Sequence, residues 1–244
     1  MTARRFGGAR AWIYTCLVVL AGNAKVLLGN RSLAGDTRSA LTGLAISGLS
    51  LLYARRIAHT NWNQLGLSPA RSMPRSVGLG ILVVSALTLF SPISARALRT
   101  IGISAEPLEP PGDLAEIPAG ALLRRVFLYL WFDTALPEEL LLRSVLFAEL
   151  RPHVPGTFRR VMLSMASFVA WHAYLGWSEV PDHNPRVLTA KFAAYALGSL
   201  IFTAPYVATG HVAGSIVAHW LTDCVLLLAG HPSGQWFRSI VIPD

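Results

Sequence analysis

Charged residues and cysteines are both scarce in this sequence. Lys, Arg, Asp and Glu make up 14% of its 244 residues, whereas hydrophobic residues make up 53% and the mean hydropathy is +0.48. This balance argues against a soluble domain and is typical of a membrane protein. The two cysteines, Cys16 and Cys224, both fall in apolar runs, so they predict neither a disulfide nor a metal site.

Apolar runs that approach the thickness of a bilayer recur along the chain. They predict an all-α fold, a polytopic membrane helix bundle of about seven (six to eight) transmembrane helices. No internal repeat is visible. The runs lie near residues 11–29, 39–54, 76–90, 126–150, 161–177, 188–208 and 211–229.

One segment, about 95–120, has the composition of an exposed loop, because it holds "EPLEPPGDLAEIPAG" with its prolines, glycines and acids. It divides the chain into N-terminal transmembrane helices with their loops over 1–120, a core over 121–230 that holds every candidate site, and a short C-terminal tail over 231–244. Nothing indicates a separate soluble domain.

The net charge of +8 does not form one basic patch, so it predicts no nucleic-acid partner. The arginines instead flank the apolar runs, which predicts a cytoplasmic N-terminus and an odd number of spans in the lipid bilayer. Alternatively, the first run could be a cleaved signal peptide, since small residues lie at Ala21–Ala24. The arginines assigned to the cytoplasm are Arg4, Arg5, Arg10, Arg55, Arg56, Arg71, Arg75, Arg151, Arg159 and Arg160.

Three ionisable residues lie together in the apolar stretch "ALPEELLLRSVLF". In a helix, Glu139 and Arg143 are four residues apart and can form a salt bridge. Glu138 points about 100° away from its neighbour and is free to face elsewhere. Pro137 should loosen the preceding helical turn.

Two further spans carry ionisable residues at helical spacing. In "SFVAWHAYLG", Phe168 and His172 are four apart, and in "SIVAHWLTD", His219 and Asp223 are four apart. Each could be a structural hydrogen-bonding residue or pair that only fixes helix packing. Counted at about 1.5 Å per residue from the predicted cytoplasmic ends, the polar residues of all three spans lie roughly 12 to 20 Å deep. A shared depth favours one site, because ionisable residues inside a bilayer are costly and usually functional.

These motifs, in this order, resemble those of the CPBP intramembrane proteases, the family of CAAX prenyl proteases and bacteriocin-processing or immunity (Abi) proteins. The matching segments are "EELLLR" (138–143), "FVAWH" (168–172) and "HWLTD" (219–223), and "TGHVAGSIVAHWLTD" (209–223) also looks like the family's approach to its last motif. The resemblance covers about 120–230. It implies a membrane endopeptidase that hydrolyses a peptide bond within or at the edge of the membrane.

By analogy with the family's glutamate-protease mechanism, Glu138 would be the general base on a water and His172 would share or orient the proton. His219 would donate to the developing oxyanion. Glu139, Arg143 and Phe168 would support these catalytic groups. Asp223 departs from the family's more usual asparagine, so it either stays protonated or only orients His219.

No metal or other cofactor is expected, although Glu138, His172 and His219 are also a plausible set of zinc ligands. The resemblance suggests a membrane-associated, prenylated or leader-type peptide as substrate. The expected location is the plasma membrane of a bacterium, with the active site nearer the cytoplasmic side. Two other functions stay open: a non-catalytic scaffold or immunity protein of the same fold, and a proton-coupled transporter.

Overall fold

The computed structural model describes residues 3–28, 35–68, 72–100, 118–178, 180 and 183–230. All regular secondary structure in these residues is helical, so the predicted all-α class is confirmed. The elements are α1 (Ala3–Leu28), α2 (Gly35–Arg56), α3 (Ser72–Thr100), α4 (Ala119–Arg124), η2 (Arg125–Ala135), α5 (Leu136–Glu139), η3 (Leu140–Val145), α6 (Leu146–Leu150), α7 (Thr157–Trp171), α8 (Ala173–Ser178), α9 (Pro185–Thr209) and α10 (Ala213–Gly230).

The elements from α4 to α6 follow one another without interruption and form one long helix over 119–150, which we call the central helix. Each predicted apolar run falls on helical structure, but the bounds differ: the run 161–177 is divided between α7 and α8 at His172, and several helices extend beyond their runs. In particular, α3 continues to Thr100, so the predicted loop does not begin at residue 95. The reason is that Ala, Leu and Arg at the end of α3 are good helix formers although the segment is no longer apolar. Residues 101–117 and the tail 231–244 lie outside the described part of the chain.

The expected seven transmembrane spans are not confirmed. Among the described residues, two helical segments are long and apolar enough by composition to cross a membrane, Ser72–Phe90 and Pro185–Thr209, and Ala213–Leu227 is apolar but shorter. The central helix carries Asp133, Glu138, Glu139 and Arg143 in its interior. The central helix is therefore the most highly charged of the long helices, and it is not apolar enough by composition to count among these segments.

The distribution of side chains over the bundle is nevertheless that of a protein surrounded by lipid. Large apolar side chains point outward, such as Leu20 at 65% exposure, Leu49 at 66% and Leu89 at 72%. Glu139 and Arg143 are both 0% exposed. An apolar surface over a charged interior is the inverse of a soluble protein and supports a membrane-embedded bundle.

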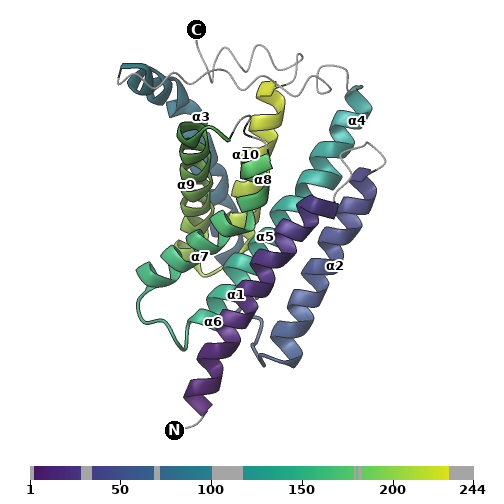
Figure 1. Ribbon diagram of the computed structural model, residues 1–244, viewed down its shortest axis with the longest axis vertical. Coiled ribbons are helices and arrows are strands. Elements are labelled where there is room, and N and C mark those ends of the chain that lie inside the picture. Colours follow the sequence, from purple (N-terminus) through teal and green to yellow (C-terminus); the bar gives the residue numbers. More distant parts are fainter. Residues whose placement is uncertain are drawn as a thin grey trace.

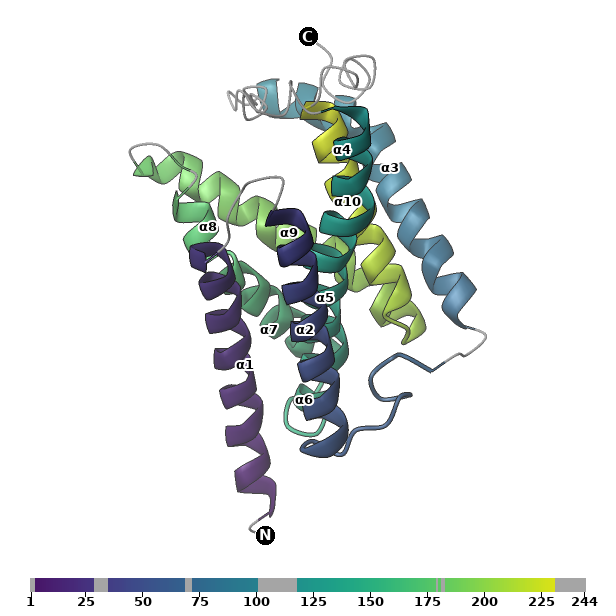
Figure 2. The same ribbon diagram turned by 90° about the vertical axis from the view of Figure 1, so that its right-hand side faces the viewer.

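The helices form a bundle around the central helix. In Figure 1, α1 and α2 run on one side of it, and α3, α9 and α10 are grouped on the other; Figure 2 shows the same groups from the side. Helix α2 packs on η2, α10 packs on α3 and α9, and α7 packs on both α1 and α9. The N-terminal helices therefore contact all of the helices that carry the three motifs.

Glycines permit two of these close helix contacts. A Cβ added to Gly43 of α2 would clash with the carbonyl oxygen of Phe132 in η2, and one added to Gly80 of α3 would clash with the carbonyl oxygen of Gly214 in α10. Small residues let helix backbones approach closely in membranes, where packing replaces the hydrophobic effect as the driving force.

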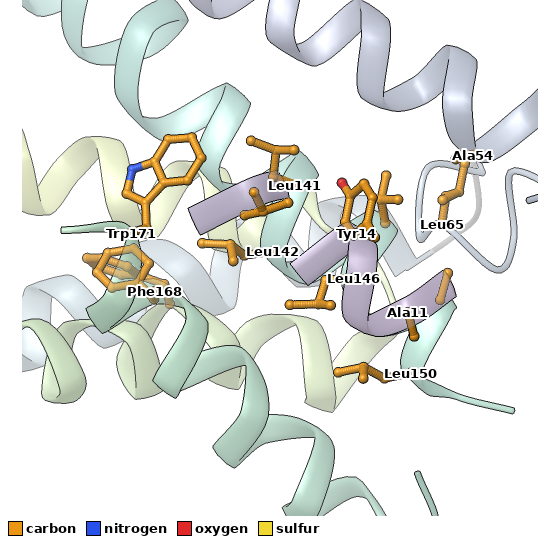
Figure 3. Close-up of a cluster of buried hydrophobic side chains, with 14 of the residues drawn as sticks. Ala11, Tyr14, Ala54, Leu65, Leu141, Leu142, Leu146, Leu150, Phe168 and Trp171 are labelled. Carbon is orange, nitrogen blue, oxygen red and sulfur yellow. The ribbon is translucent and has the colours of Figure 1, made fainter. Parts of the chain in front are cut away.

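One hydrophobic cluster joins the N-terminal helices to the C-terminal half. It includes Tyr14 of α1, Ala54 of α2, Leu146 of the central helix, and Phe168 and Trp171 of α7. Figure 3 shows the cluster with Phe168 and Trp171 on one side, Leu146 and Tyr14 in the middle and Ala54 on the other side. The sequence predicted domain boundaries at residues 120 and 230, and both stay predictions. The hydrophobic cluster contains residues from both sides of the first boundary, and the residues after the second boundary are not described.

Arginines gather where α1, α3 and α7 begin and where α2 and the central helix end. In Figures 1 and 2, α1 begins and α2 and the central helix end in the lower part of the picture, whereas α3 begins near mid-height; we call these helix ends together the lower end. The opposite end also carries basic residues, and the predicted acidic loops contain Glu106, Glu109, Asp113, Glu116, Glu179 and Asp182, all outside the described residues. The membrane orientation therefore stays a prediction. The described arginines of the lower end are Arg10, Arg55, Arg56, Arg75, Arg151, Arg159 and Arg160.

Candidate active site

The central helix departs from α-helical geometry on both sides of its two adjacent glutamates. Arg125–Ala135 and Leu140–Val145 are π-helical, and Pro137 lies between them just before Glu138. Proline cannot donate a backbone hydrogen bond, so the loosened turn expected from Pro137 agrees with the wider helix before it. π-Helical segments are rare and frequently occur at functional sites.

Glu139 and Arg143 form the buried ion pair that their spacing predicts. Arg143 Nη1 lies 3.1 Å from Glu139 Oε1, and the guanidinium also donates through Nη2 to the hydroxyl of Ser199 at 2.8 Å and through Nε to Thr203 Oγ1 at 3.2 Å. Both partners belong to α9. The guanidinium carbon lies 4.9 Å from the ring centre of Phe168. Arg143 therefore connects the central helix to α9 and α7.

Glu138 faces the two histidines. Its Oε2 lies 3.6 Å from His172 Nε2 and 3.9 Å from His219 Nε2, and it is buried without a hydrogen-bond partner. The other ring nitrogen of His172, Nδ1, is engaged by the backbone oxygen of Phe168 at 2.9 Å. Each Nε2 is slightly too far from Glu138 for a direct hydrogen bond, so a single water lying beside the three atoms could contact all of them.

His219 lies between three carboxylates. Its Nδ1 is 2.8 Å from Glu139 Oε1, while its Nε2 is 3.6 Å from Asp223 Oδ2 as well as close to Glu138. The contact with Glu139 was not predicted, since the sequence analysis paired Glu139 with Arg143 alone. Glu139 thus accepts from Arg143 and from His219 on the same oxygen, and it links the ion pair directly to the histidine.

Aromatic rings enclose both imidazoles. The ring of Phe202 stacks on His219 with centroids 4.3 Å apart, and that of Tyr195 stacks on His172 at 4.8 Å. Phe168 lies 4.4 Å from His172 and 5.9 Å from His219. These rings fix the imidazole planes and limit the access of water, so that electrostatic interactions inside the site are strengthened.

The start of α10 is held in place by a turn outside the apolar segments. His211 Nδ1 accepts a hydrogen bond from the backbone N–H of Ala213 at 3.1 Å, and Ser76 of α3 donates to the His211 carbonyl at 2.7 Å. Burial lowers the pKa of His211, which favours the neutral imidazole that this acceptor role requires. The turn sets the register of α10, and with it the position of His219.

The structure brings the predicted residues of all three motifs together, but the sequence analysis missed several of their partners. On α9, Tyr195, Ser199, Phe202 and Thr203 line the site at helical spacing. Serine and threonine are common in membrane helices, so this face gave little signal. A charged residue inside an apolar run is a stronger signal of a functional or structural role. This signal marks one further ion pair.

That pair consists of Lys25 on α1 and Asp133 on the central helix. Lys25 Nζ lies 3.0 Å from Asp133 Oδ1 and also donates to the Asp133 backbone oxygen, and Asp133 is 1% exposed. Both residues interrupt predicted spans, so a complete list of charges inside the spans would have identified them. The pair joins the N-terminal helix to the π-helical segment just before Glu138.

The donor atoms can be compared with the needs of a metal ion. Among the described residues, no group of three or more His, Cys, Asp or Glu side chains is arranged to hold one. The chemistry of the set is nonetheless suitable for zinc, because Glu138, His172 and His219 offer one oxygen and two nitrogens. In both histidines Nδ1 is already engaged, as it commonly is in metal ligands.

Comparison with protein-family models gives one match. Residues 121–225 match the Rce1-like family, described as type II CAAX prenyl endopeptidase Rce1-like. The matched segment contains Glu138, His172, His219 and Asp223, and the match confirms the resemblance to CPBP proteases over this part of the chain. Searches of curated proteins and of solved structures found no match.

Proposed function

Because residues 121–225 are an Rce1-like domain of the type II CAAX prenyl endopeptidase kind, we propose that the chain is an intramembrane endopeptidase in which Glu138 activates the attacking water. The observation that carries this proposal is the convergence of three helices on one carboxylate oxygen. Glu138 Oε2 has two imidazole nitrogens within 4 Å and no hydrogen-bond partner. Such a geometry suits a group that binds a water and exchanges its proton.

In the proposed reaction, a water lies beside Glu138 Oε2 and the two Nε2 atoms, within hydrogen-bond reach of all three. Glu138 takes a proton from it, and the hydroxide oxygen adds to the carbonyl carbon of the scissile peptide bond. The tetrahedral intermediate then breaks at its C–N bond, and the proton passes by way of Glu138 and His172 to the leaving amine nitrogen. The engagement of His172 Nδ1 by the Phe168 carbonyl supports this role, because it leaves Nε2 to exchange protons.

His219 is the proposed oxyanion donor. Its Nδ1 faces Glu139 at 2.8 Å and its Nε2 faces the space next to Glu138, so a doubly protonated ring would donate in both directions. Asp223, at 3.6 Å from Nε2, would orient this ring in place of the family's more usual asparagine. Glu139 and Arg143 would hold the ring and the helix, with Phe168 packed between them.

We propose that the reaction uses no metal, with zinc as the alternative. Glu138, His172 and His219 are the residues that would hold the ion, which when bound would make water more acidic and polarise the substrate carbonyl. Under either chemistry Glu138 is indispensable. The metal content of the purified protein distinguishes the two.

The family implies a peptide substrate within reach of the membrane. We propose a prenylated or leader-type peptide, and a bacterial plasma membrane with the N-terminus in the cytoplasm. The arginine-rich end of the bundle supports this orientation by the positive-inside rule. The proposed site would then open nearer the cytoplasmic side.

The central helix offers a matched control for a test of this function. Glu149 is also a buried glutamate, 2% exposed, but it binds Arg10 at 3.1 Å at the end of the bundle. Purified protein in lipid nanodiscs is given an internally quenched farnesylated peptide with a CAAX terminus. We expect Glu138→Gln to lower the cleavage rate by about 1,000-fold or more, while Glu149→Gln retains it. Cleavage that survives Glu138→Gln would refute the proposed base.

A second experiment, which needs no chosen substrate, covers the case in which the farnesylated peptide is not cleaved. Comparing protein termini in membranes of cells that carry the wild type or Glu138→Gln should reveal ends made only by the wild type. No difference in any terminus would favour the non-catalytic scaffold or immunity protein. Substrate-dependent uptake into proteoliposomes would instead favour the transporter, for which the chain shows no repeat between its halves.

A further inference from the structure

Helix α7 ends at Trp171, directly before His172. The backbone of His172 has φ −95° and ψ 7°, outside helical values, and α8 starts at Ala173. In an uninterrupted helix the backbone N–H of Tyr174 would bond to the carbonyl of Ala170. Here the Tyr174 N–H donates to a side chain of another helix, Asn23 of α1. The helix is therefore interrupted at the residue proposed to exchange protons with Glu138.

The side chain of Asn23 on α1 fills this interruption. Its Nδ2 donates to the Ala170 carbonyl at 2.9 Å, and its Oδ1 accepts from the Tyr174 N–H at 2.8 Å. The carboxamide thus satisfies the two backbone groups that the interruption leaves free, one on each side of His172. A side chain inserted into the hydrogen bonds of a helix is one of the known causes of a kink.

The neighbours of Asn23 hold α1 in the required position. A Cβ added to Gly22 would clash with the indole of Trp171, so the glycine lets α1 approach α7 closely. Lys25 binds Asp133 in the central helix at 3.0 Å. The stretch from Gly22 to Lys25 therefore touches the helix that carries His172 and the helix that carries Glu138.

We propose that Asn23, which lies outside the segment matched to the protease family, is a positioning residue that holds the α7–α8 break so that His172 Nε2 faces Glu138. The proposal rests on the proposed function for its consequence in catalysis, but the clamp itself can be measured without any substrate. The two hydrogen bonds to α1 restrain the backbone on both sides of His172. Without Asn23, the backbone around His172 would be free to shift relative to Glu138.

The test uses Asn23→Leu, in full-length protein in nanodiscs. The change keeps nearly the same volume and removes the hydrogen bonds to Ala170 and Tyr174, together with the bond that Nδ2 donates to the Val19 carbonyl within α1 at 2.8 Å. Thr15→Val is the matched control, because Thr15 is a part-buried polar residue of α1 whose hydroxyl donates to the Ala11 carbonyl in its own helix at 2.9 Å. Hydrogen exchange of the peptide that contains Tyr174 is measured first. We expect roughly 3- to 10-fold faster exchange in Asn23→Leu and no change in Thr15→Val.

Steady-state kinetics on the quenched farnesylated peptide is measured next. A displaced His172 should lower kcat by about 10-fold or more with KM nearly unchanged, since the substrate surface is intact. A role in stability alone would instead lower the yield of folded protein and leave kcat per folded molecule unchanged. If Asn23→Leu does not fold, Asn23→Gln, which keeps both groups on a longer side chain, is judged by the same two criteria.

Each outcome decides one of the two proposals. Unchanged exchange at Tyr174 overturns the clamp, and faster exchange with unchanged kcat overturns the positioning role. Faster exchange with a lower kcat supports both. If the wild type cleaves no peptide, the protease proposal is what fails for this substrate class, and exchange alone then decides whether Asn23 holds the break.

Discussion

Arg143 offers the most quantitative test of how the site is held together. The guanidinium is 0% exposed and binds Glu139 within its own helix. It makes three hydrogen bonds to α9: to Ser199 O at 3.0 Å, to Ser199 Oγ at 2.8 Å and to Thr203 Oγ1 at 3.2 Å. Interhelical hydrogen bonds in membranes contribute about 0.6 kcal/mol each on average. Arg143→Lys, which keeps the cation but loses these bonds, should therefore cost about 2 kcal/mol of unfolding free energy.

Arg143→Met should cost more, because it leaves the Glu139 carboxylate buried without its cation. Breaking such a pair from one side typically costs about 3–5 kcal/mol. Changing both members, in Glu139→Gln with Arg143→Met, should recover part of that loss, since no uncompensated charge remains. The unfolding free energy can be followed by tryptophan fluorescence during titration with a denaturing detergent.

Two results would contradict this account of Arg143. If Arg143→Lys were as costly as Arg143→Met, the hydrogen bonds to α9 rather than the charge of Glu139 would dominate. If the double variant were no more stable than Arg143→Met, Glu139 would not be the group that needs the cation.

Three further predictions follow from the same contacts. Glu138→Gln should raise the unfolding free energy by about 1 kcal/mol while abolishing cleavage, because it neutralises a buried carboxylate oxygen without a partner; a lower stability in the same titration would contradict this. Gly43→Ala should cost about 1–3 kcal/mol by overpacking against Phe132, whereas Gly48→Ala, where an added Cβ meets nothing within 4 Å, should be neutral or slightly stabilising; equal melting temperatures would refute the close contact. Removal of metal ions with a chelator, checked by mass spectrometry for metals, should leave the rate of peptide cleavage unchanged; a loss of cleavage that added zinc restores would show that the water is activated by a metal.

The approximate positions of the helices could be predicted from the sequence because apolar runs coincide with helical structure, but the break at His172 between α7 and α8 was not predicted. The Glu139–Arg143 pair could be predicted as well, since helical spacing alone brings residues four apart together. The approach of His172 and His219 to Glu138 followed from depth and from the resemblance. Each of these predictions depends on the spacing of residues along one helix or on the predicted depth of a residue in the membrane.

The contacts between helices could not be predicted in the same way. Glu139 binds His219, and the ring of Phe202 stacks on the ring of His219. Both contacts depend on how α9 and α10 are rotated about their axes relative to the central helix. Rotation about a helix axis leaves apolarity and depth unchanged, so no one-dimensional pattern reports it. The π-helical segments add to the difficulty, because they change the angle between successive side chains from the 100° of an α-helix.

The N-terminal third has no motif of its own, yet each of its helices contacts a different helix of the site. On α1, Asn23 holds the break beside His172; on α2, Gly43 lies against the segment that precedes Glu138; on α3, Ser76 holds the start of α10, which carries His219. A site assembled from three helices needs their mutual positions fixed more precisely than lipid and apolar packing can achieve. The N-terminal helices supply that precision through single polar or small residues, and such residues leave no trace in a hydropathy pattern.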